Sequence, residues 1–252
     1  MKQAQLKFSA IEKCGWLSSL VIFCALCSNL YAKEADDSFH FELTPYLWAA
    51  SIKGTTAANG EESPPIDTDY NFFALDNLDG VASATFTASK NQWGLLFDFL
   101  YVAYEDTFME ATPLQTTPKL EGTIIEFAGA YAPTSIDKLE FIAGLRQQDI
   151  TVSLALLNRN PEQSATWIDP FAGIIYTRPL KGNFHMALRG DLGGFGIKSD
   201  MAVNAEAVFR YQMGNTFSIK LGYRYLKVKF GDSNFLYDLS LDGFQLGLGI
   251  RF

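Results

Sequence analysis

The sequence predicts an all-β fold, a transmembrane antiparallel up-and-down β-barrel of ten strands, with eight or twelve strands as the alternatives. Three observations predict it. Apolar and polar residues alternate with a period of two over most of the chain after residue 39. Short and long connections follow one another in strict alternation, as in the barrels of bacterial outer membranes. The last residue, Phe252, ends an alternating strand with an aromatic side chain.

The first 32 residues are expected to be a secretory signal peptide that is cleaved after Ala32. Three lysines and an apolar run over residues 16–30 precede this small residue. An uncleaved membrane helix and a lipid-modified cysteine are the alternatives. Residues 33–252 are then expected to form the barrel, exported into a Gram-negative envelope.

The composition narrows the classes of protein further. Cys14, Cys24 and Cys27 all lie in the first 32 residues, so no disulfide or cysteine metal ligand is expected in the mature chain. Removing the three bases and one acid of this segment from 20 Lys+Arg and 28 Asp+Glu leaves 17 and 27, a net charge of −10. This charge argues against nucleic acid as a partner. An aromatic content of 14% fits strands that each turn one face to lipid.

The expected strands follow from the alternating runs. In one of them, Trp93, Phe97 and Tyr101 share a face, while Gly94, Asp98 and Val102 share the other. Strands are expected near residues 39–52, 80–90, 92–105, 118–132, 138–156, 165–178, 183–193, 199–213, 216–230 and 236–252. Most exceed the roughly 9–11 residues that a tilted membrane strand requires.

The connections fall into two kinds. Short turns are expected at Lys90-Asn91, Pro133–Asp137, Lys181-Gly182 and Gly214-Asn215. Longer segments are expected at 53–79, 106–117, 157–164, 194–198 and 231–235, the first being a long external loop. Since external loops are long and periplasmic turns short, both termini are expected in the periplasm. A soluble β-sandwich is the alternative, but such a fold has no reason to sort its loops in this way.

The last strand changes parity along its length. Tyr237, Leu239 and Leu241 stand on odd positions, whereas the apolar residues after Gly243 stand on even positions up to Phe252. A β-bulge near Asp242-Gly243 is therefore predicted, because one extra residue exchanges the two faces. The terminal aromatic resembles the signal that the outer-membrane assembly machinery reads, so that machinery is an expected partner, together with outer-membrane lipid and lipopolysaccharide.

Seven stretches are similar to a family of uncharacterised proteobacterial outer-membrane barrel proteins. They are LTPYLWAASIKG (Leu43–Gly54), NLDG (Asn77–Gly80), WGLLFDFLYV (Trp93–Val102), WIDPFAGIIY (Trp167–Tyr176), RGDLGGFGIKSD (Arg189–Asp200), GYRYL (Gly222–Leu226) and LGLGIRF (Leu246–Phe252). The resemblance implies the fold and the outer-membrane location, and it implies no activity. Met201-Ala202 departs from the aromatic residue that the family has after the last Asp of the fifth stretch.

Turning the apolar residues toward lipid places many charged side chains in the lumen. A Lys or Arg on the lipid face near the midplane would cost about 2–4 kcal/mol, which supports this assignment. The expected lumen charge network consists of Glu42, Asp98, Glu126, Glu140, Arg146, Asp169, Arg189, Asp191, Glu206, Arg210, Lys220, Arg224 and Arg251. Because acids and bases nearly balance, we interpret the protein as a barrel with a charge-filled lumen and a structural or surface-contact role. A narrow, porin-like channel for small polar or charged solutes is the alternative.

No catalytic, metal or cofactor site is predicted. His40 and His185 are the only histidines, and both are expected near the periplasmic end, away from an external active site. A hydrolase built on rim carboxylates is the alternative. The acids of loop 53–79 lack the EF-hand pattern and are expected to be solvated, with the loop's aromatics at the barrel mouth. The glycine-rich run 189–196 lacks a P-loop lysine and a following helix, so it is expected to pack tightly at the rim.

Overall fold

The structure is a computed structural model that describes residues 38–58, 66–70, 78–105, 117–155, 162–231 and 235–252. Its strands are β1 (His40–Ala58), β2 (Ile66–Tyr70), β3 (Leu78–Lys90), β4 (Trp93–Glu105), β5 (Thr117–Tyr131), β6 (Leu139–Ala155), β7 (Glu162–Pro179), β8 (Phe184–Gly193), β9 (Ser199–Met213), β10 (Phe217–Gly231) and β11 (Phe235–Arg251). In these ranges no helix is long and apolar enough to cross a membrane. The expected signal peptide lies outside them and stays a prediction.

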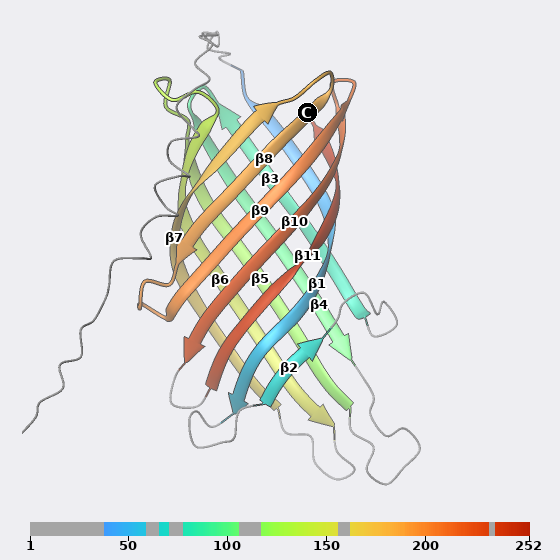
Figure 1. The fold of residues 1–252 in the computed structure, drawn as a ribbon, viewed down its shortest axis with the longest axis vertical. Helices are drawn as coiled ribbons and strands as arrows, with labels where there is room; N and C mark the ends of the chain where they lie inside the picture. Colours follow the sequence, from blue (N-terminus) through green and yellow to red (C-terminus); the bar gives the residue numbers. More distant parts are fainter. Residues whose placement is uncertain (1–37, 59–65, 71–77, 106–116, 156–161, 232–234) are drawn as a thin grey trace, which may run out of the picture. The chain divides into compact units, whose positions relative to one another are not determined.

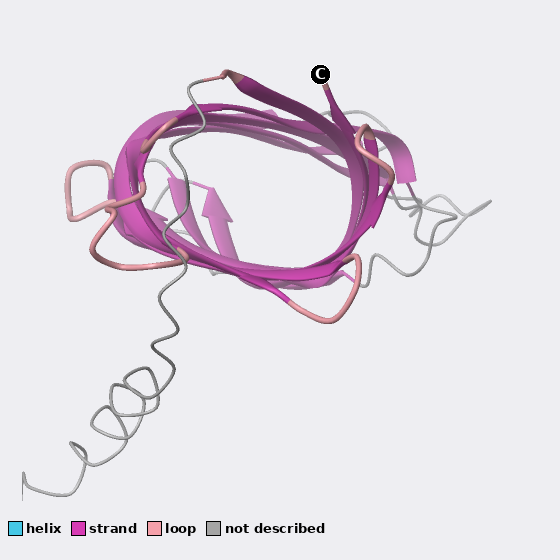
Figure 2. Ribbon diagram, turned by 90° about the horizontal axis from the view of Figure 1, so that it is seen from above, coloured by secondary structure: helices cyan, strands magenta, loops and turns pink. Residues whose placement is uncertain are grey.

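Ten of these strands close an antiparallel barrel, which confirms the predicted fold class. Each strand from β3 to β11 pairs with the next along the chain, and β1 pairs with both β3 and β11. The β1–β11 ladder runs from Glu42 opposite Arg251 to Ala58 opposite Phe235. Seen along the barrel, the strands form a closed ring (Figure 2), and from the side they are steeply inclined (Figure 1).

The strand boundaries agree with the prediction to within three residues, except at β1. This strand extends to Ala58, and its outer part also pairs with β2, a short strand that was not predicted within the 53–79 segment. The β1–β3 ladder covers only His40–Pro45. Proline has no N–H to donate, so Pro45 is a natural place for the ladder to end.

The two ends of the barrel carry different connections. The four short turns and both ends of the barrel chain share one end, here called the terminal end, where Phe41 and Phe252 exchange backbone hydrogen bonds of 3.3 and 3.1 Å. Asn91 and Gly214 adopt positive φ in two of these turns, as tight hairpins require. The connections at the opposite end, here called the loop end, lie partly outside the described ranges.

Near the terminal end, the outer face of the barrel is apolar and the inner face is polar. A belt of exposed apolar side chains surrounds this half and includes Leu47, Leu95, Phe97, Phe127, Leu145, Ile174, Leu188, Phe209, Leu221, Phe244, Leu246 and Leu248. Aromatic rings border the belt at the terminal end, among them Trp93 against Tyr131 (4.7 Å between ring centroids) and Phe184 against Tyr211 (4.9 Å). This distribution is the one expected for strands that pass through a bilayer.

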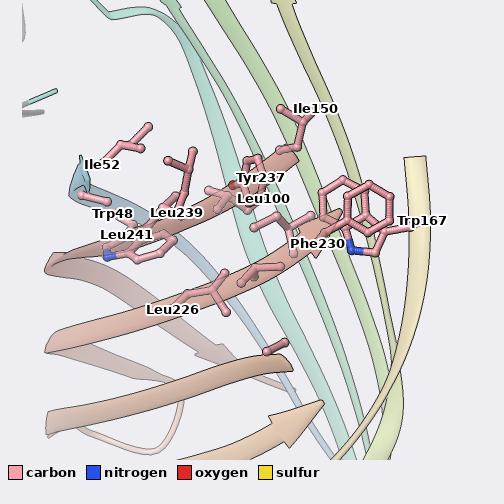
Figure 3. Packing of buried hydrophobic residues seen from close by; sticks show 14 of the residues in the cluster. Trp48, Ile52, Leu100, Ile150, Trp167, Leu226, Phe230, Tyr237, Leu239 and Leu241 are labelled. Atoms are coloured by element: carbon pink, nitrogen blue, oxygen red, sulfur yellow. The ribbon is translucent and has the colours of Figure 1, made fainter. Parts of the chain in front are cut away.

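Toward the loop end the polarity is inverted on β1, β10 and β11, whereas Ile168, Leu192 and Met201 remain exposed apolar side chains on β7–β9. A buried cluster fills the inside, here called the apolar plug: Tyr46, Trp48, Ala50, Ile52, Leu100, Ile124, Ile150, Trp167, Ala202, Leu226, Val228, Phe230, Tyr237, Leu239 and Leu241 (Figure 3). The Trp167 and Phe230 rings stack at 4.3 Å and 7°. On the outer face of the same strands lie charged pairs such as Lys227–Asp238 (3.4 Å) and Lys229–Asp200 (3.9 Å). An apolar inside with a charged outside is the arrangement of a barrel wall in water.

The predicted β-bulge near Asp242-Gly243 is wrong. The register of β11 against β1 and against β10 runs without a shift through both residues. Leu241 is buried inside the barrel and Phe244 is 54% exposed outside, as uninterrupted alternation demands. The parity of the apolar residues changes because the surroundings of the strand change, from an apolar belt outside to an apolar plug inside.

Candidate functional site

The polar core of the barrel is built around Glu126 on β5. Its carboxylate accepts hydrogen bonds from Arg146 Nε (2.8 Å), Arg189 Nη2 (2.7 Å) and Arg224 Nη2 (2.9 Å). These bases come from β6, β8 and β10, so one carboxylate joins strands around the barrel. The Glu126 and Arg146 side chains are both 0% exposed.

Two further carboxylates complete this group. Asp191 accepts from Arg146 Nη2 (2.7 Å), Arg189 Nε (2.8 Å) and Asn204 Nδ2 (2.8 Å). Asp98 accepts from Arg224 Nη1 (3.2 Å), from Thr85 Oγ1 (2.7 Å) and from the Tyr46 hydroxyl (3.1 Å). Three arginines therefore face three carboxylates, here called the arginine network: Asp98, Glu126, Arg146, Arg189, Asp191 and Arg224.

The arginine network meets aromatic rings as well as carboxylates. The Arg146 guanidinium lies 4.8 Å from the centroid of the Phe171 ring, and Arg224 lies 5.1 Å from that of Trp48. Trp48 also belongs to the apolar plug, so the two layers are in direct contact. Paired charges with many hydrogen bonds can be buried at tolerable cost, because each desolvated group keeps a partner.

The other seven charged residues expected in the lumen fall outside this network. At the terminal end, Glu42 binds Arg251 (2.7 Å) and Lys220, with Arg210 at 3.7 Å. Glu206 accepts from Gln245, and Glu140 is half-buried. Asp169 is held by uncharged donors: it accepts from Trp167 Nε1 (3.1 Å), from Ser199 N (2.9 Å) and from the Ser199 hydroxyl. It thus ties β7 to the start of β9.

Several uncharged members of the site were not expected. Tyr46, Thr85 and Asn204 donate to or accept from the arginine network, and Trp48 covers Arg224. A signal was present in the sequence, because Glu42, Tyr46 and Trp48 stand on positions of the same parity in β1. It was missed because large apolar side chains were assigned to the lipid face.

The remaining candidates take no part in the arginine network. Both histidines lie at the terminal end, His40 opposite Ser89 and His185 opposite Arg210. In the described ranges no group of three or more His, Cys, Asp or Glu residues could hold a metal ion. Most of loop 53–79, with the acids considered for calcium and the aromatics expected at the mouth, lies outside those ranges or has undescribed side chains.

The glycine-rich run is partly as expected. A Cβ on Gly193 would lie 2.9 Å from the Pro170 carbonyl oxygen, so this position is tightly packed. A Cβ on Gly190 would meet nothing within 4 Å. Gly194 and Gly196 have positive φ in the turn before β9, which is the property that glycine supplies there.

Comparison with known proteins supports no narrower assignment. No protein-family model matches the chain, and no curated protein matches it. Among solved structures, the attachment invasion locus protein Ail of Yersinia pestis is 12% identical, with a TM-score of 0.39, over 87% of this chain and 100% of that chain. The translocator domain of the autotransporter NalP from Neisseria meningitidis is 11% identical, with a TM-score of 0.45, over 94% of each chain. The P. putida toluene transporter TodX is 8% identical, with a TM-score of 0.28, over 86% of this chain and 90% of that chain. Such distant likenesses carry no argument about function.

Proposed function

We propose that this protein is a non-conducting outer-membrane β-barrel with a structural or surface-contact role. The observation that carries the proposal is the double closure of the lumen, first by the arginine network and then by the apolar plug. Glu126, Arg146, Leu226 and Val228 are all 0% exposed. Two consecutive layers of buried side chains support a lumen without a continuous water path, and a water path is what an ion needs to cross.

The proposed place in the membrane follows from the outer face. The apolar belt and its aromatic border match the lipid-facing surface of outer-membrane barrels. The charged outer pairs near the loop end would then stand in water outside the membrane, and the short turns and both termini in the periplasm. Outer-membrane lipid and lipopolysaccharide would contact the belt, and the assembly machinery would recognise Phe252, which is 70% exposed.

A pair of substitutions on the outer face of β1 tests this placement. Leu47 belongs to the belt, and Ser51 lies on the same face four residues later, opposite Asp242. We expect Leu47→Arg to lower the free energy of unfolding in lipid vesicles by about 2–4 kcal/mol, because a guanidinium would face hydrocarbon. Ser51→Arg should change it by no more than about 0.5 kcal/mol. Urea titration of both variants measures the difference, and equal effects would contradict the proposed membrane boundary.

The absence of conductance is tested in planar lipid bilayers. The refolded protein should give no stable current steps under applied voltage, while heat-modifiable migration of the same preparation on gels shows that the barrel is folded. Co-reconstitution with a known porin verifies that vesicle fusion delivers protein to the bilayer. Reproducible open steps from the folded barrel alone would overturn the proposal in favour of the channel.

The charges inside the barrel are the observation that favours a narrow channel as the second candidate. Both signs of charge line the space between the terminal end and the arginine network, and channels for polar solutes use such linings. The conductance measurement separates the two candidates. We propose no catalytic role, because the two histidines lie at the terminal end and the acids of the arginine network are held by arginines.

A further inference from the structure

A cavity lies between the arginine network and the terminal end of the barrel. Its volume is about 280 Å³, and it is lined by residues from β1, β3, β4 and β7–β11. Asp98 and Arg224 of the arginine network are among the residues that line it. At roughly 30 Å³ for each water molecule in the liquid, this space equals about nine waters, which is enough for a small organic molecule.

The cavity opens toward the terminal end only. Side chains at that end are more exposed than those of the arginine network: 40% for Arg251 and 24% for Lys220, against 8% for Arg189 and 0% for Glu126. Beyond Glu126 the apolar plug begins, with Leu226 at 0% exposure. A molecule that enters at the terminal end therefore meets a closed wall, as in a binding pocket.

Three basic side chains approach one carboxylate at the mouth of the cavity. In the described part of the chain, the Glu42 carboxylate at this end is approached by three bases: Lys220, Arg251 and Arg210. Arg210 is the least satisfied of the three, since its Nη1 lies 3.7 Å from the Glu42 carboxylate and its buried Nε has no hydrogen-bond partner. A guanidinium in that state can donate to a further anion.

The other acid that lines the cavity outside the arginine network, Glu206, is engaged by other groups. It accepts a hydrogen bond from Gln245 and lies opposite Arg189 and Arg224 in the neighbouring strands. Among the lining residues, four are basic (Arg189, Arg210, Lys220 and Arg224) and three are acidic (Glu42, Asp98 and Glu206). Arg189 and Arg224 are already paired with Glu126 and Asp191, so the bases left to bind an anion are those around Glu42.

The walls between the charged mouth and the arginine network are largely apolar. Leu96, Ile175 and Val208 line the space. Threonines on β1, β3 and β7 line it with them, together with the polar side chains of His185, Glu206 and Gln245. Pockets of this kind bind a ligand by its apolar body and orient it with a few polar groups. A fully hydrated inorganic anion would leave these walls without a partner.

We propose that this cavity binds a small organic monoanion, a carboxylate with a short alkyl or aromatic body. The carboxylate is bound by Arg210 and Lys220 at the mouth, and the apolar body lies against Leu96, Ile175 and Val208. Binding takes place from the terminal end and involves no passage through the barrel. The closed inner wall of the pocket rests on the sealed lumen proposed above, whereas anion binding itself is measured without reference to conductance.

Isothermal titration of the refolded barrel in a zwitterionic detergent with sodium hexanoate tests the proposal, with protein-free micelles as the blank. We expect saturable binding to one site, and binding of the neutral analogue hexanamide weaker by about tenfold or more, because the charge-assisted hydrogen bonds are lost. Absence of saturable binding, or equal affinity for the two probes, would overturn it.

Three variants locate the binding site, each first checked for a folded barrel by heat-modifiable migration. Arg210→Gln removes the proposed anion partner and should weaken hexanoate binding by about tenfold. Ala187→Leu fills the cavity from β8 without changing its charge and should abolish binding. Arg178→Gln removes one arginine charge from an exposed position on β7, at the terminal end of the barrel, and should leave the affinity unchanged. Hexanoate binding that survives Ala187→Leu, or that falls equally in Arg178→Gln and Arg210→Gln, refutes the assignment to this cavity.

Discussion

Glu126→Gln is expected to lower the free energy of unfolding by about 3–5 kcal/mol, one of the two largest single-residue effects that this structure predicts. The substitution keeps the shape of the side chain and removes one negative charge that Arg146, Arg189 and Arg224 share. Three buried guanidinium groups would then face two carboxylates. The amide of glutamine would also direct its own donors toward at least one arginine. Urea-induced unfolding of the protein in lipid vesicles, followed by heat-modifiable migration, measures the loss.

Glu121→Gln on the same strand is the matched control. Glu121 is exposed on the outer face of β5, five residues before Glu126, and its neutralisation should change stability by no more than about 0.5 kcal/mol. If both variants lost the same small amount, the interior would be hydrated well enough to screen the charges. That result would remove the main support for a sealed lumen.

The strands could be predicted from the sequence because each wall residue faces one of two different environments. Alternation predicted both boundaries of nine of the ten barrel strands, and it missed only the loop-end part of β1. That part, Lys53–Ala58, contains glycine and small or polar residues and has no apolar alternation of its own. It is a strand because β11 and β2 pair with it on both sides. Its own residues do not predict this pairing.

The wrong bulge has a physical cause that a single strand cannot reveal. A bulge and a change of surroundings both move the apolar residues to positions of the other parity. In three neighbouring strands, however, the apolar residues move from the outer to the inner face at about the same level. Ile52 on β1, Val228 on β10 and Leu239 on β11 are all buried inside. An independent bulge in each strand is a poorer explanation than one boundary crossed by all three. Reading the three strands together would have predicted a wall that leaves the membrane.

The charge pairing was beyond the reach of the sequence. Parity placed Glu126 and Arg224 on inner faces, but these residues are separated by 98 positions along the chain. Their contact depends on the barrel's closure and on the relative heights of β5 and β10. Asp169 illustrates the same limit, because its partner Ser199 carries no charge and could not be singled out by charge balance.

Phe230→Ala is expected to cost about 3–5 kcal/mol of unfolding free energy, the second large effect. Phe230 is 7% exposed in the apolar plug, and its ring stacks on Trp167 at 4.3 Å. Truncation removes that stacking and leaves a cavity among the buried side chains of the apolar plug. Neither lipid nor detergent can enter such a cavity, so the packing loss adds to the loss of hydrophobic transfer free energy.

Phe127→Ala provides the comparison that isolates this cavity. Phe127 belongs to the outer belt and is 55% exposed, so lipid chains or detergent can fill the space that its ring leaves. Only the transfer free energy of the ring is then lost, about 1.5–3 kcal/mol. A larger loss at Phe230 in urea titrations of both variants means that the plug is a packed core like that of a water-soluble barrel. An equal or smaller loss at Phe230 would mean that water enters the plug when the ring is removed. A plug that admits water would not keep the lumen closed.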